Sequence, residues 1–417
     1  MEFIEEPKRE TPVIGEYDVI VVGGGVAGIV AAIAAARNGA KVTLIEQYGF
    51  LGGTATAGLM TSINGFRNEK PPNALQTVEG IAQELVLKMY QLGGVFIKNT
   101  AYEQEKLDID RGELPYAIVF DPEVFKYVVN KMILDAGIKL YLHTYALDAI
   151  TEDNIIRGVI IHNKSGRQAM MGNIVIDASG DGDIAASAGA PFVIDKEKDG
   201  KRMAMTQMFR LANIDLSRIP KEIHGILIRN TYVSWGGSVD AIGIDEEDLT
   251  RAEIEAREKT WKKIEEIKKL PGFEDAFLVE TATHIGVRET RRFIGEYILK
   301  ESDAKDDVRF DDVIAISSNP VPAYYGYRYY YPHLGFDVPY RCVVPKEIDN
   351  LLLAGRNISM EQPPFQSARS MAPNMAIAQA VGTAAALCVK EKVGPRELNV
   401  KELQSVLVTQ GAVISRE

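Results

Sequence analysis

Hydrophobic residues near the N-terminus occur in short apolar runs separated by an alanine-rich segment. Residues 17–22 are rich in β-branched side chains, which predicts a buried strand. Residues 28–37 are rich in alanine and predict a helix, which Asn38 and Gly39 would end. Residues 41–46 alternate between apolar and polar side chains and predict a second strand. The chain therefore opens with a strand, a tight turn, a helix and a strand.

The rest of the pattern predicts an α/β fold with a second, mixed domain. The expected elements are helices at 78–92, from Pro122, at 246–269 and at 371–390, and strands at 138–146, 155–162, 167–171, 173–178 and 351–354. The first three of these strands are expected to form a small meander. We divide the chain into a tail (1–16), a first domain (17–190) that the return segment 346–417 completes, and a mixed α+β domain (191–345).

Composition and charge exclude several classes of protein. The 417 residues are 46% hydrophobic and 25% charged, as expected for a globular protein. With 47 Lys and Arg against 58 Asp and Glu, the net charge of −11 argues against non-specific nucleic-acid binding. Cys342 and Cys388 are too few for an iron–sulfur cluster or a structural zinc site and form no C-x-x-C motif. We expect no metal and two buried, structural thiols.

The sequence carries no recognisable address signal. Residues 1–16 are charged and lack the apolar core of a signal peptide. Two uncharged stretches, 19–36 and 370–389, are interrupted by glycine, proline or polar residues, so we expect buried elements rather than membrane spans. A cytoplasmic location is the default expectation.

A glycine triplet, Gly23-x-Gly25-x-x-Gly28, lies between the first predicted strand and the helix. In dinucleotide-binding units the first glycine permits the tight turn and the second lets the backbone approach a pyrophosphate. The third lets the helix and the strand pack closely. Glu46, at the end of the next strand, would accept hydrogen bonds from ribose hydroxyls and disfavour a 2′-phosphate. The triplet alone leaves FAD, NAD and a unit without ligand open.

Five later motifs follow the triplet in a fixed order. They are FLGGTATAG (50–58), DASGDGD (177–183), GVRETRRFIG (286–295), VPYRCVVP (338–345) and NLLLAGR (350–356). From residue 17 to 411 the chain resembles the FAD-dependent oxidoreductase family, a branch of the glutathione-reductase-like flavoproteins. Its layout is similar to that of the fumarate reductase and succinate dehydrogenase flavoprotein. The resemblance implies a Rossmann-type FAD-binding domain with a β-meander, and a substrate or cap domain.

The resemblance also implies which residues hold the cofactor. These are Gly23, Gly25, Val26, Ala27, Gly28, Glu46, Gln47, Gly52, Gly53, Thr54, Asp177, Gly180, Asp181, Gly355, Arg356 and Asn374. The helix near Pro373 and Asn374 would direct its N-terminus at the flavin pyrimidine. Covalent relatives have a histidine where this chain has Gly53, so FAD is expected to be non-covalent. No second G-x-G-x-x-G motif follows a strand, so an NAD(P)H domain of the disulfide-reductase type is missing.

A basic cluster stands out in the second domain. His284, Arg288, Arg291 and Arg292 are close in sequence, and in an extended segment Arg288 and Arg292 would share a face. Arginine can clamp a carboxylate and orient it for hydride transfer. The alternative is a strand whose arginines pair with nearby glutamates. Arg369 is a further candidate, because a similar arginine anchors the substrate carboxylate in fumarate reductases.

We therefore expect a flavoenzyme that moves a hydride between a small organic substrate and FAD, with Arg369, His284, Arg288 and Arg292 as catalytic candidates. A carboxylate is one candidate substrate, and the electron acceptor and the oligomeric state stay open. A tyrosine-rich block at 324–331, with His333, would wall the pocket or only pack as strands. The alternatives are a thiazole-synthase-like or NAD-binding relative and an electron-transfer subunit.

Overall fold

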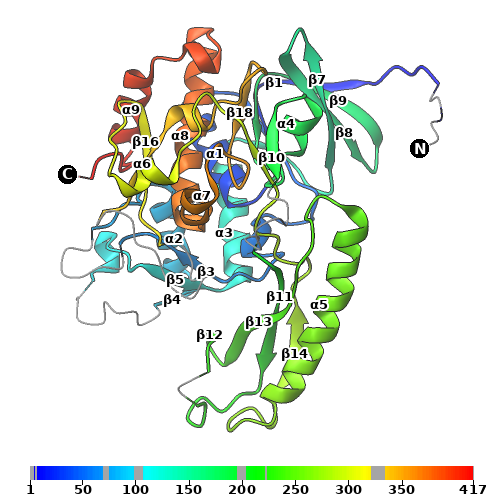
Figure 1. Cartoon of the computed structure of the whole chain (residues 1–417), viewed down its shortest axis with the longest axis vertical. Coiled ribbons are helices and arrows are strands. Elements are labelled where there is room, and N and C mark those ends of the chain that lie inside the picture. The colour runs from blue at the N-terminus through cyan, green and yellow to red at the C-terminus, as the bar shows by residue number, and fades with distance from the viewer. Residues whose placement is uncertain are drawn as a thin grey trace.

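The computed structural model describes residues 4, 7–68, 75–97, 107–194, 203–220, 223–320 and 334–416. Two parts are visible in Figure 1. The larger part is built around a mainly parallel sheet and contains both ends of the chain. The smaller part, at the bottom of the view, is built from an antiparallel sheet and one long helix.

The main sheet places the carboxyl ends of its parallel strands at one edge. Its parallel strands lie in the order β6 (Lys139–Tyr141), β2 (Val42–Ile45), β1 (Val13–Val22), β9 (Gly166–Asp177) and β18 (Leu351–Leu353). Val22 is level with Ile45 on one side and with Asp177 on the other, and Leu353 is also level with Asp177. The loops that leave these strands therefore begin side by side, which is where ligands bind in open parallel sheets.

The meander forms, but from different strands than the sequence pattern predicts. It consists of β7 (Tyr145–Glu152), β8 (Ile155–Asn163) and the first half of β9, all antiparallel. The predicted strand 138–146 is wrong as one element, because β6 joins the parallel sheet and β7 starts a new direction. The predicted strands 167–171 and 173–178 are one continuous strand. Its first half pairs with β8 and its second half pairs with β18.

Two apolar helices pack together on one face of the main sheet. They are α1 (Val26–Arg37) and α8 (Met371–Glu391), and most of their residues are buried. At their crossing a Cβ on Gly382 would lie 2.0 Å from the backbone oxygen of Ala31, so only glycine allows this approach. α8 is long and apolar enough to cross a membrane, but 89% of its most apolar stretch is buried inside the protein. It is therefore a core helix.

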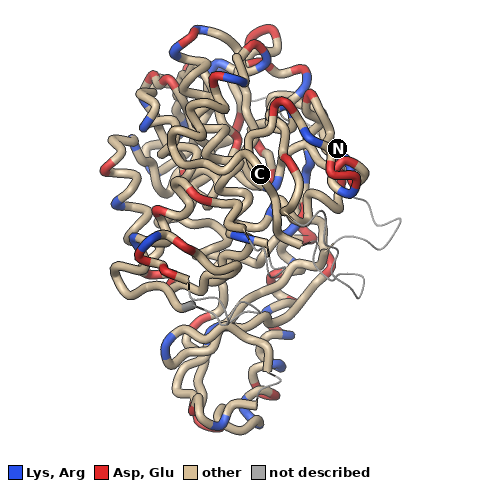
Figure 2. Tube along the Cα trace, turned by 90° about the vertical axis from the view of Figure 1, so that its left-hand side faces the viewer, with Lys and Arg blue, Asp and Glu red and all other residues tan. Residues whose placement is uncertain are grey.

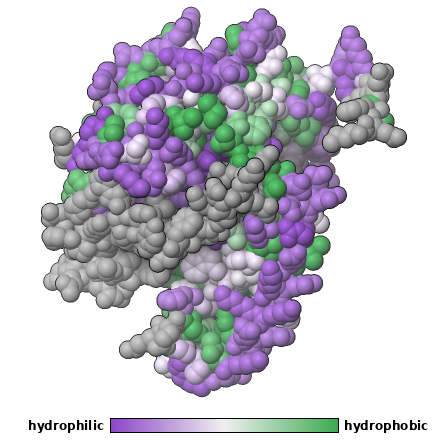
Figure 3. Space-filling model, viewed as in Figure 1, coloured by the Kyte–Doolittle hydropathy of each residue, from purple (hydrophilic) through white to green (hydrophobic). Residues whose placement is uncertain are grey.

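The smaller part contains what we call the cap sheet. Its strands lie in the order β12 (Ile226–Ile228), β13 (Thr231–Val239), β11 (Met205–Ala212) and β14 (Phe277–Thr281). The charged helix α5 (Glu246–Ile267) packs on one face of this sheet with its few apolar residues. Figure 3 shows a mainly hydrophilic surface along α5, which agrees with the solvated face that its Lys and Glu content predicts.

The other helices and strands of the described residues complete the fold. They are β3 (Ser62–Asn64), α2 (Gly80–Gln91), β4 (Val95–Ile97), β5 (Ala117–Phe120), α3 (Pro122–Asp135), α4 (Asp183–Ser187), β10 (Phe192–Ile194), β15 (Arg291–Phe293), α6 (Glu301–Lys305), β16 (Val313–Ser317), β17 (Phe336–Pro339), α7 (Gln362–Ala368) and α9 (Val400–Thr409). Buried residues between Phe293 and Val344 belong to the main core, although the sequence assigns them to the second domain. The domain boundaries given in the sequence analysis therefore remain a prediction.

The two cysteines are buried, and charges of both signs are mixed along the chain (Figure 2). Cys342 and Cys388 are both free and buried, and burial raises the pKa of the Cys388 thiol to about 12, so neither is a reactive thiolate at neutral pH. Figure 2 shows Lys and Arg interspersed with Asp and Glu along the chain. This view offers no large face of one sign.

Replacing Gly28 by alanine should destabilise the fold. The added Cβ would lie 1.8 Å from the backbone oxygen of Gly23, so α1 would have to move away from β1. Overpacking of this kind costs about 1–3 kcal/mol or more. Thermal unfolding of Gly28→Ala against wild type measures the cost. An unchanged Tm would contradict the close packing of helix and strand.

Candidate active site

A cavity of about 670 Å³ lies at the carboxyl edge of the main sheet, between that sheet and the cap sheet. Most residues that the sequence singles out line it. These are Gly23, Gly25, Val26, Ala27, Glu46, Gln47, Gly53, Thr54, Gly180, Asp181, His284, Arg288, Gly355, Arg356, Arg369 and Asn374. Among the described residues, four predicted ones do not line it: Gly28, Gly52, Asp177 and Arg292. Segments far apart in the sequence therefore build one site.

The three glycines of the triplet have three different surroundings. Gly23 has φ +100°, and a Cβ there would lie 2.3 Å from the backbone oxygen of Ala178. Gly28 packs against Gly23, as described above. A Cβ on Gly25, by contrast, would meet nothing within 4 Å. Gly25 faces open cavity, so a ligand can approach its backbone closely.

The N-terminus of α1 opens into the cavity. Gly25 is its N-cap and offers no side-chain cap, and the first turn carries no acidic residue. The N–H groups of this turn and the partial positive charge of the helix end therefore suit an anion. A pyrophosphate is the ligand for which this arrangement is known.

Glu46 leaves the end of β2 and is almost fully buried. Its Oε2 accepts a hydrogen bond from Gly24 N (2.7 Å), and its Oε1 accepts one from Tyr48 N (2.8 Å). Burial raises the pKa of the carboxyl, and these backbone hydrogen bonds lower it. The two bonds fix the carboxylate beside the glycine turn, with lone pairs left for ribose hydroxyls.

The loop after β2 returns to the glycine turn. Gly52 N donates to Gly24 O (2.8 Å), and a Cβ on Gly53 would lie 3.0 Å from Gly25 Cα. Gly52 thus pins the loop without lining the cavity, whereas Gly53 and Thr54 reach the cavity wall. A bulky side chain at position 53 would push the two loops apart.

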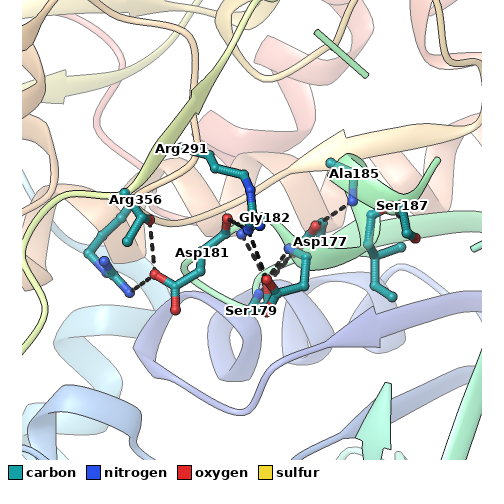
Figure 4. Close-up of polar contacts among 11 residues, drawn as sticks. Asp177, Ser179, Asp181, Gly182, Ala185, Ser187, Arg291 and Arg356 are labelled. Atoms are coloured by element: carbon teal, nitrogen blue, oxygen red, sulfur yellow. Dashed lines mark hydrogen bonds and ion pairs between the residues drawn. The ribbon is translucent and has the colours of Figure 1, made fainter. Parts of the chain in front are cut away.

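Asp177 holds the loop after β9 in place through hydrogen bonds. This fully buried carboxylate accepts hydrogen bonds from Ser179 N (3.0 Å), Ser179 Oγ (2.7 Å) and Ala185 N (2.7 Å), as Figure 4 shows. Burial raises its pKa, and the hydrogen bonds oppose that shift. Asp177 therefore shapes the loop that carries Gly180 and Asp181 and does not itself reach the cavity.

Asp181 and Arg356 face each other across the next part of the wall. Arg356 Nη2 donates to Asp181 Oδ1 (2.8 Å) (Figure 4). Thr290 Oγ1 donates to the same oxygen (2.9 Å). Arg356 Nη1 is buried and has no hydrogen-bond partner among the described residues. A buried guanidinium nitrogen without an acceptor is costly, so this atom fits a ligand oxygen.

The N-terminus of α8 opens into the same cavity. Ser370 is its N-cap without capping through its side chain, and both Ser370 and Asn374 line the wall. Asn319 Nδ2 donates to Ser370 Oγ (2.7 Å), and Tyr116 OH donates to Asn319 Oδ1. Asn374 Oδ1 is buried, and no residue in the described part of the chain donates to it. Two uncapped helix ends, those of α1 and α8, therefore meet at one cavity.

Arg369 precedes α8 and is held by neutral groups. Its Nε donates to Gln366 Oε1 (2.8 Å), and its Nη2 lies 2.9 Å from Met203 Sδ. Gln366 in turn donates to the buried carboxylate of Glu289. Burial, together with the charge of Arg288, lowers the pKa of Arg369 to about 10, while Glu289 acts in the opposite direction. An anion in the cavity would stabilise this guanidinium.

The segment 284–292 divides its basic residues among three places. His284 and Arg288 line the cavity, and Arg288 Nη1 donates to Thr206 Oγ1 (2.8 Å). Arg292 Nε donates to Met360 O (3.0 Å), away from the cavity wall. Arg291 donates to Asp181 O and Asp183 Oδ1 (both 2.9 Å). The expectation that Arg288 and Arg292 share a face is wrong, because β15 begins only at Arg291.

Several cavity residues carry no signal that the sequence alone reveals. They are Tyr48, Tyr116, Met203, Thr206, Met208, Trp235, Asn319 and Ser370. Most are single side chains on strands or loops. Only the folded structure determines where these side chains point. The tyrosine block 324–331 and His333 lie outside the described residues. Within the described part of the chain, no group of His, Cys, Asp and Glu could hold a metal.

The profile of the FAD dependent oxidoreductase family matches residues 18–227 and 217–407. The chain belongs to the FAD-dependent oxidoreductase family. The site fits that cofactor, because the open glycine cradle, the buried Glu46 and the unpartnered Arg356 Nη1 suit a dinucleotide. The chain is thus a flavoenzyme with FAD as its cofactor.

Individual relatives match only parts of the chain. A digeranylgeranylglycerophospholipid reductase of Methanosarcina acetivorans is 25% identical over 175 residues, which is 39% of this chain and 38% of the relative. A thiamine thiazole synthase of Methanococcus vannielii is 29% identical over 154 residues (37% and 49%). A cinnamate reductase of Clostridium sporogenes is 40% identical over 90 residues (21% and 12%). The chain spans less than half the length of each.

Solved structures share the fold at low identity. A geranylgeranyl bacteriochlorophyll reductase-like protein from Thermoplasma acidophilum gives a TM-score of 0.50 at 14% identity, with 95% of this chain and 84% of that chain covered. A flavin-dependent brominase triple mutant gives 0.51 at 14% identity (94% and 84%). These likenesses support the FAD-binding fold alone.

Replacing Gly25 by alanine should weaken FAD binding without unfolding the protein. The new methyl group meets no atom of the described residues within 4 Å, and Gly25 has φ −71°, which alanine adopts freely. It would fill the cradle for the pyrophosphate, so FAD affinity should fall about tenfold or more. Mass spectrometry and the absorbance of heat-released ligand measure FAD per protein, and Tm controls for folding.

Glu46→Ala should lower FAD occupancy at least several-fold for a different reason, the loss of acceptors for the ribose hydroxyls.

Gly25→Ala protein with full FAD content and wild-type Tm would show that the cofactor does not approach this turn.

Proposed function

We propose that this flavoenzyme transfers a hydride between a small organic substrate and non-covalently bound FAD. The observation that carries the proposal is the meeting of two walls at one cavity. One wall holds the dinucleotide fingerprint and the uncapped end of α8, and the other holds Arg288 and His284 beside the cap sheet. Bound FAD supplies the redox chemistry, by accepting or donating a hydride at N5.

The main-sheet wall would hold the cofactor. The N–H groups of Val26 and Ala27 would bind the pyrophosphate, and Glu46 with Gln47 would lie at the ribose. Arg356 Nη1 would give its free donor to a cofactor oxygen. The α8 N-terminus, with Asn374, would lie at the flavin pyrimidine, where the helix end stabilises negative charge.

Residues of both walls would orient the substrate, Arg369 beside the α8 end and Arg288 beside the cap sheet. Arg369 and Arg288 would bind a substrate carboxylate or another oxygen and fix the carbon that exchanges the hydride. A charge-assisted contact also relieves the cost of burying Arg369. The imidazole of His284 reaches the same cavity and would exchange a proton through a ring nitrogen as the hydride moves.

The match to a thiamine thiazole synthase supports a second candidate function. The thiamine thiazole synthase of Methanococcus vannielii resembles part of the chain, so a non-redox relative that shares the nucleotide fold is the rival. Anaerobic mixing of the yellow protein with small acids, amines and alcohols separates the two. Bleaching of the flavin by a substrate supports the proposal, and a protein whose flavin no substrate reduces supports the rival.

The flavin should leave the protein when the protein is denatured. Gly53 occupies the position of the histidine through which covalent relatives attach FAD, and glycine has no group that could form the link. Acid precipitation should therefore leave all yellow colour in the supernatant. A pellet that stays yellow, or a band that fluoresces on a denaturing gel, would refute non-covalent binding.

Removal of the Arg369 guanidinium should slow the chemistry and spare cofactor binding. In Arg369→Ala, flavin reduction by the substrate should slow by roughly 30- to 1000-fold, which corresponds to about 2–4 kcal/mol for a lost charge-assisted contact. Arg369→Lys should recover part of the rate because it keeps the charge without the two-pronged geometry. Anaerobic stopped-flow absorbance follows the reduction.

Arg111→Ala serves as the matched control, since Arg111 is a highly exposed arginine paired with Asp108. It should reduce at the wild-type rate. If Arg369→Ala also reduces normally while it retains FAD, Arg369 does not orient the substrate.

A further inference from the structure

The cap-sheet wall of the cavity changes from basic to apolar along strand β11. Thr206 and Met208 both line the cavity, and as residues two apart they lie on one face of the strand, about 7 Å from each other. Thr206 accepts a hydrogen bond from Arg288 Nη1 (2.8 Å), so the basic end is fixed there. Met208 marks the start of the apolar end.

A bulge in the neighbouring strand brings an aromatic side chain to that apolar end. Thr206 is level with Ser238 but Met208 is level with Trp235, so β13 carries an extra residue between these pairs. Bulges re-aim side chains in this way. Gly236 and Gly237 lie within the bulge and let α5 pack closely on it, because a Cβ on either would lie within 2.3 Å of α5 atoms.

The apolar end is a small packed cluster. Met208, Trp235 and Met60 belong to one hydrophobic cluster between the cap sheet and the main part, and all three reach the cavity. Met208 is 3% exposed, whereas Trp235 keeps part of its ring accessible. Accessible aromatic and thioether surface beside a basic group suits a ligand with an apolar body and an anionic head.

We propose that the substrate is an apolar carboxylic acid. Its carboxylate binds Arg288 and Arg369, and its hydrocarbon body lies on Met208, Trp235 and Met60. This inference rests on the proposed function, since it places the substrate in the same cavity. It adds that binding strength depends on the apolar body as well as on the charge.

The two tryptophans of the chain allow a direct binding test. Trp235 lines the cavity, whereas Trp261 lies on α5 and is 56% exposed, so Trp261→Phe leaves Trp235 as the single tryptophan, whose fluorescence can be excited at wavelengths above the tyrosine absorption band. The FAD-loaded variant is titrated with acetate, butyrate, hexanoate and octanoate. Each buried methylene should tighten binding about fourfold until the apolar wall is covered. The matching alcohols should bind much more weakly.

A second variant keeps the test decisive. In Trp235→Ala, followed by the change in flavin absorbance, octanoate should bind at least about tenfold more weakly. Butyrate should change much less. FAD content and Tm confirm folding. Equal affinity for acetate and octanoate, equal affinity for acids and alcohols, or an unchanged octanoate affinity in Trp235→Ala would each overturn the inference. Acids that bind as expected in a protein whose flavin no substrate reduces would support it while refuting the proposed function.

Discussion

Two helix N-termini without side-chain caps meet at one cavity, and much of the fold serves to hold them there. The α1 end depends on the close contact of Gly28 with Gly23, and the position of α8 depends on the contact of Gly382 with Ala31. Each contact is possible only without a Cβ. The free N–H groups and the positive ends of both dipoles then need acceptors, which a dinucleotide with a flavin supplies.

Arginines in the cavity wall also favour an anionic ligand. Arg288, Arg356 and Arg369 all line the cavity, and burial together with the other two arginines lowers the pKa of Arg369. Arg356 is paired with Asp181, whereas burial and repulsion from the other arginines disfavour the charge of Arg369, so an anion beside Arg369 would stabilise it. We infer that cofactor and substrate share this charge. Arg356 lies beside the Asp181 loop, whereas Arg288 is tied to the cap sheet.

The sequence predicts those features that depend on neighbouring residues. The Gly23 turn, the α1 start and Glu46 follow from spacing, because backbone sterics act locally. The direction of Arg292 does not follow, since it depends on where β15 begins and on its packing against Met360. Asp177 belongs to a recognisable motif, but only the structure shows that it supports the loop from below. Trp235 depends on a bulge that no local pattern indicates.

The most direct test of this account is a crystal structure of the enzyme with FAD bound. The account predicts the pyrophosphate within hydrogen-bond distance of the N–H groups of Val26 and Ala27, and the flavin pyrimidine at the N-terminus of α8 beside Asn374. The exposed face of the ring should be directed toward Arg288 and the cap sheet. A flavin ring that lies away from the α8 N-terminus would contradict the account.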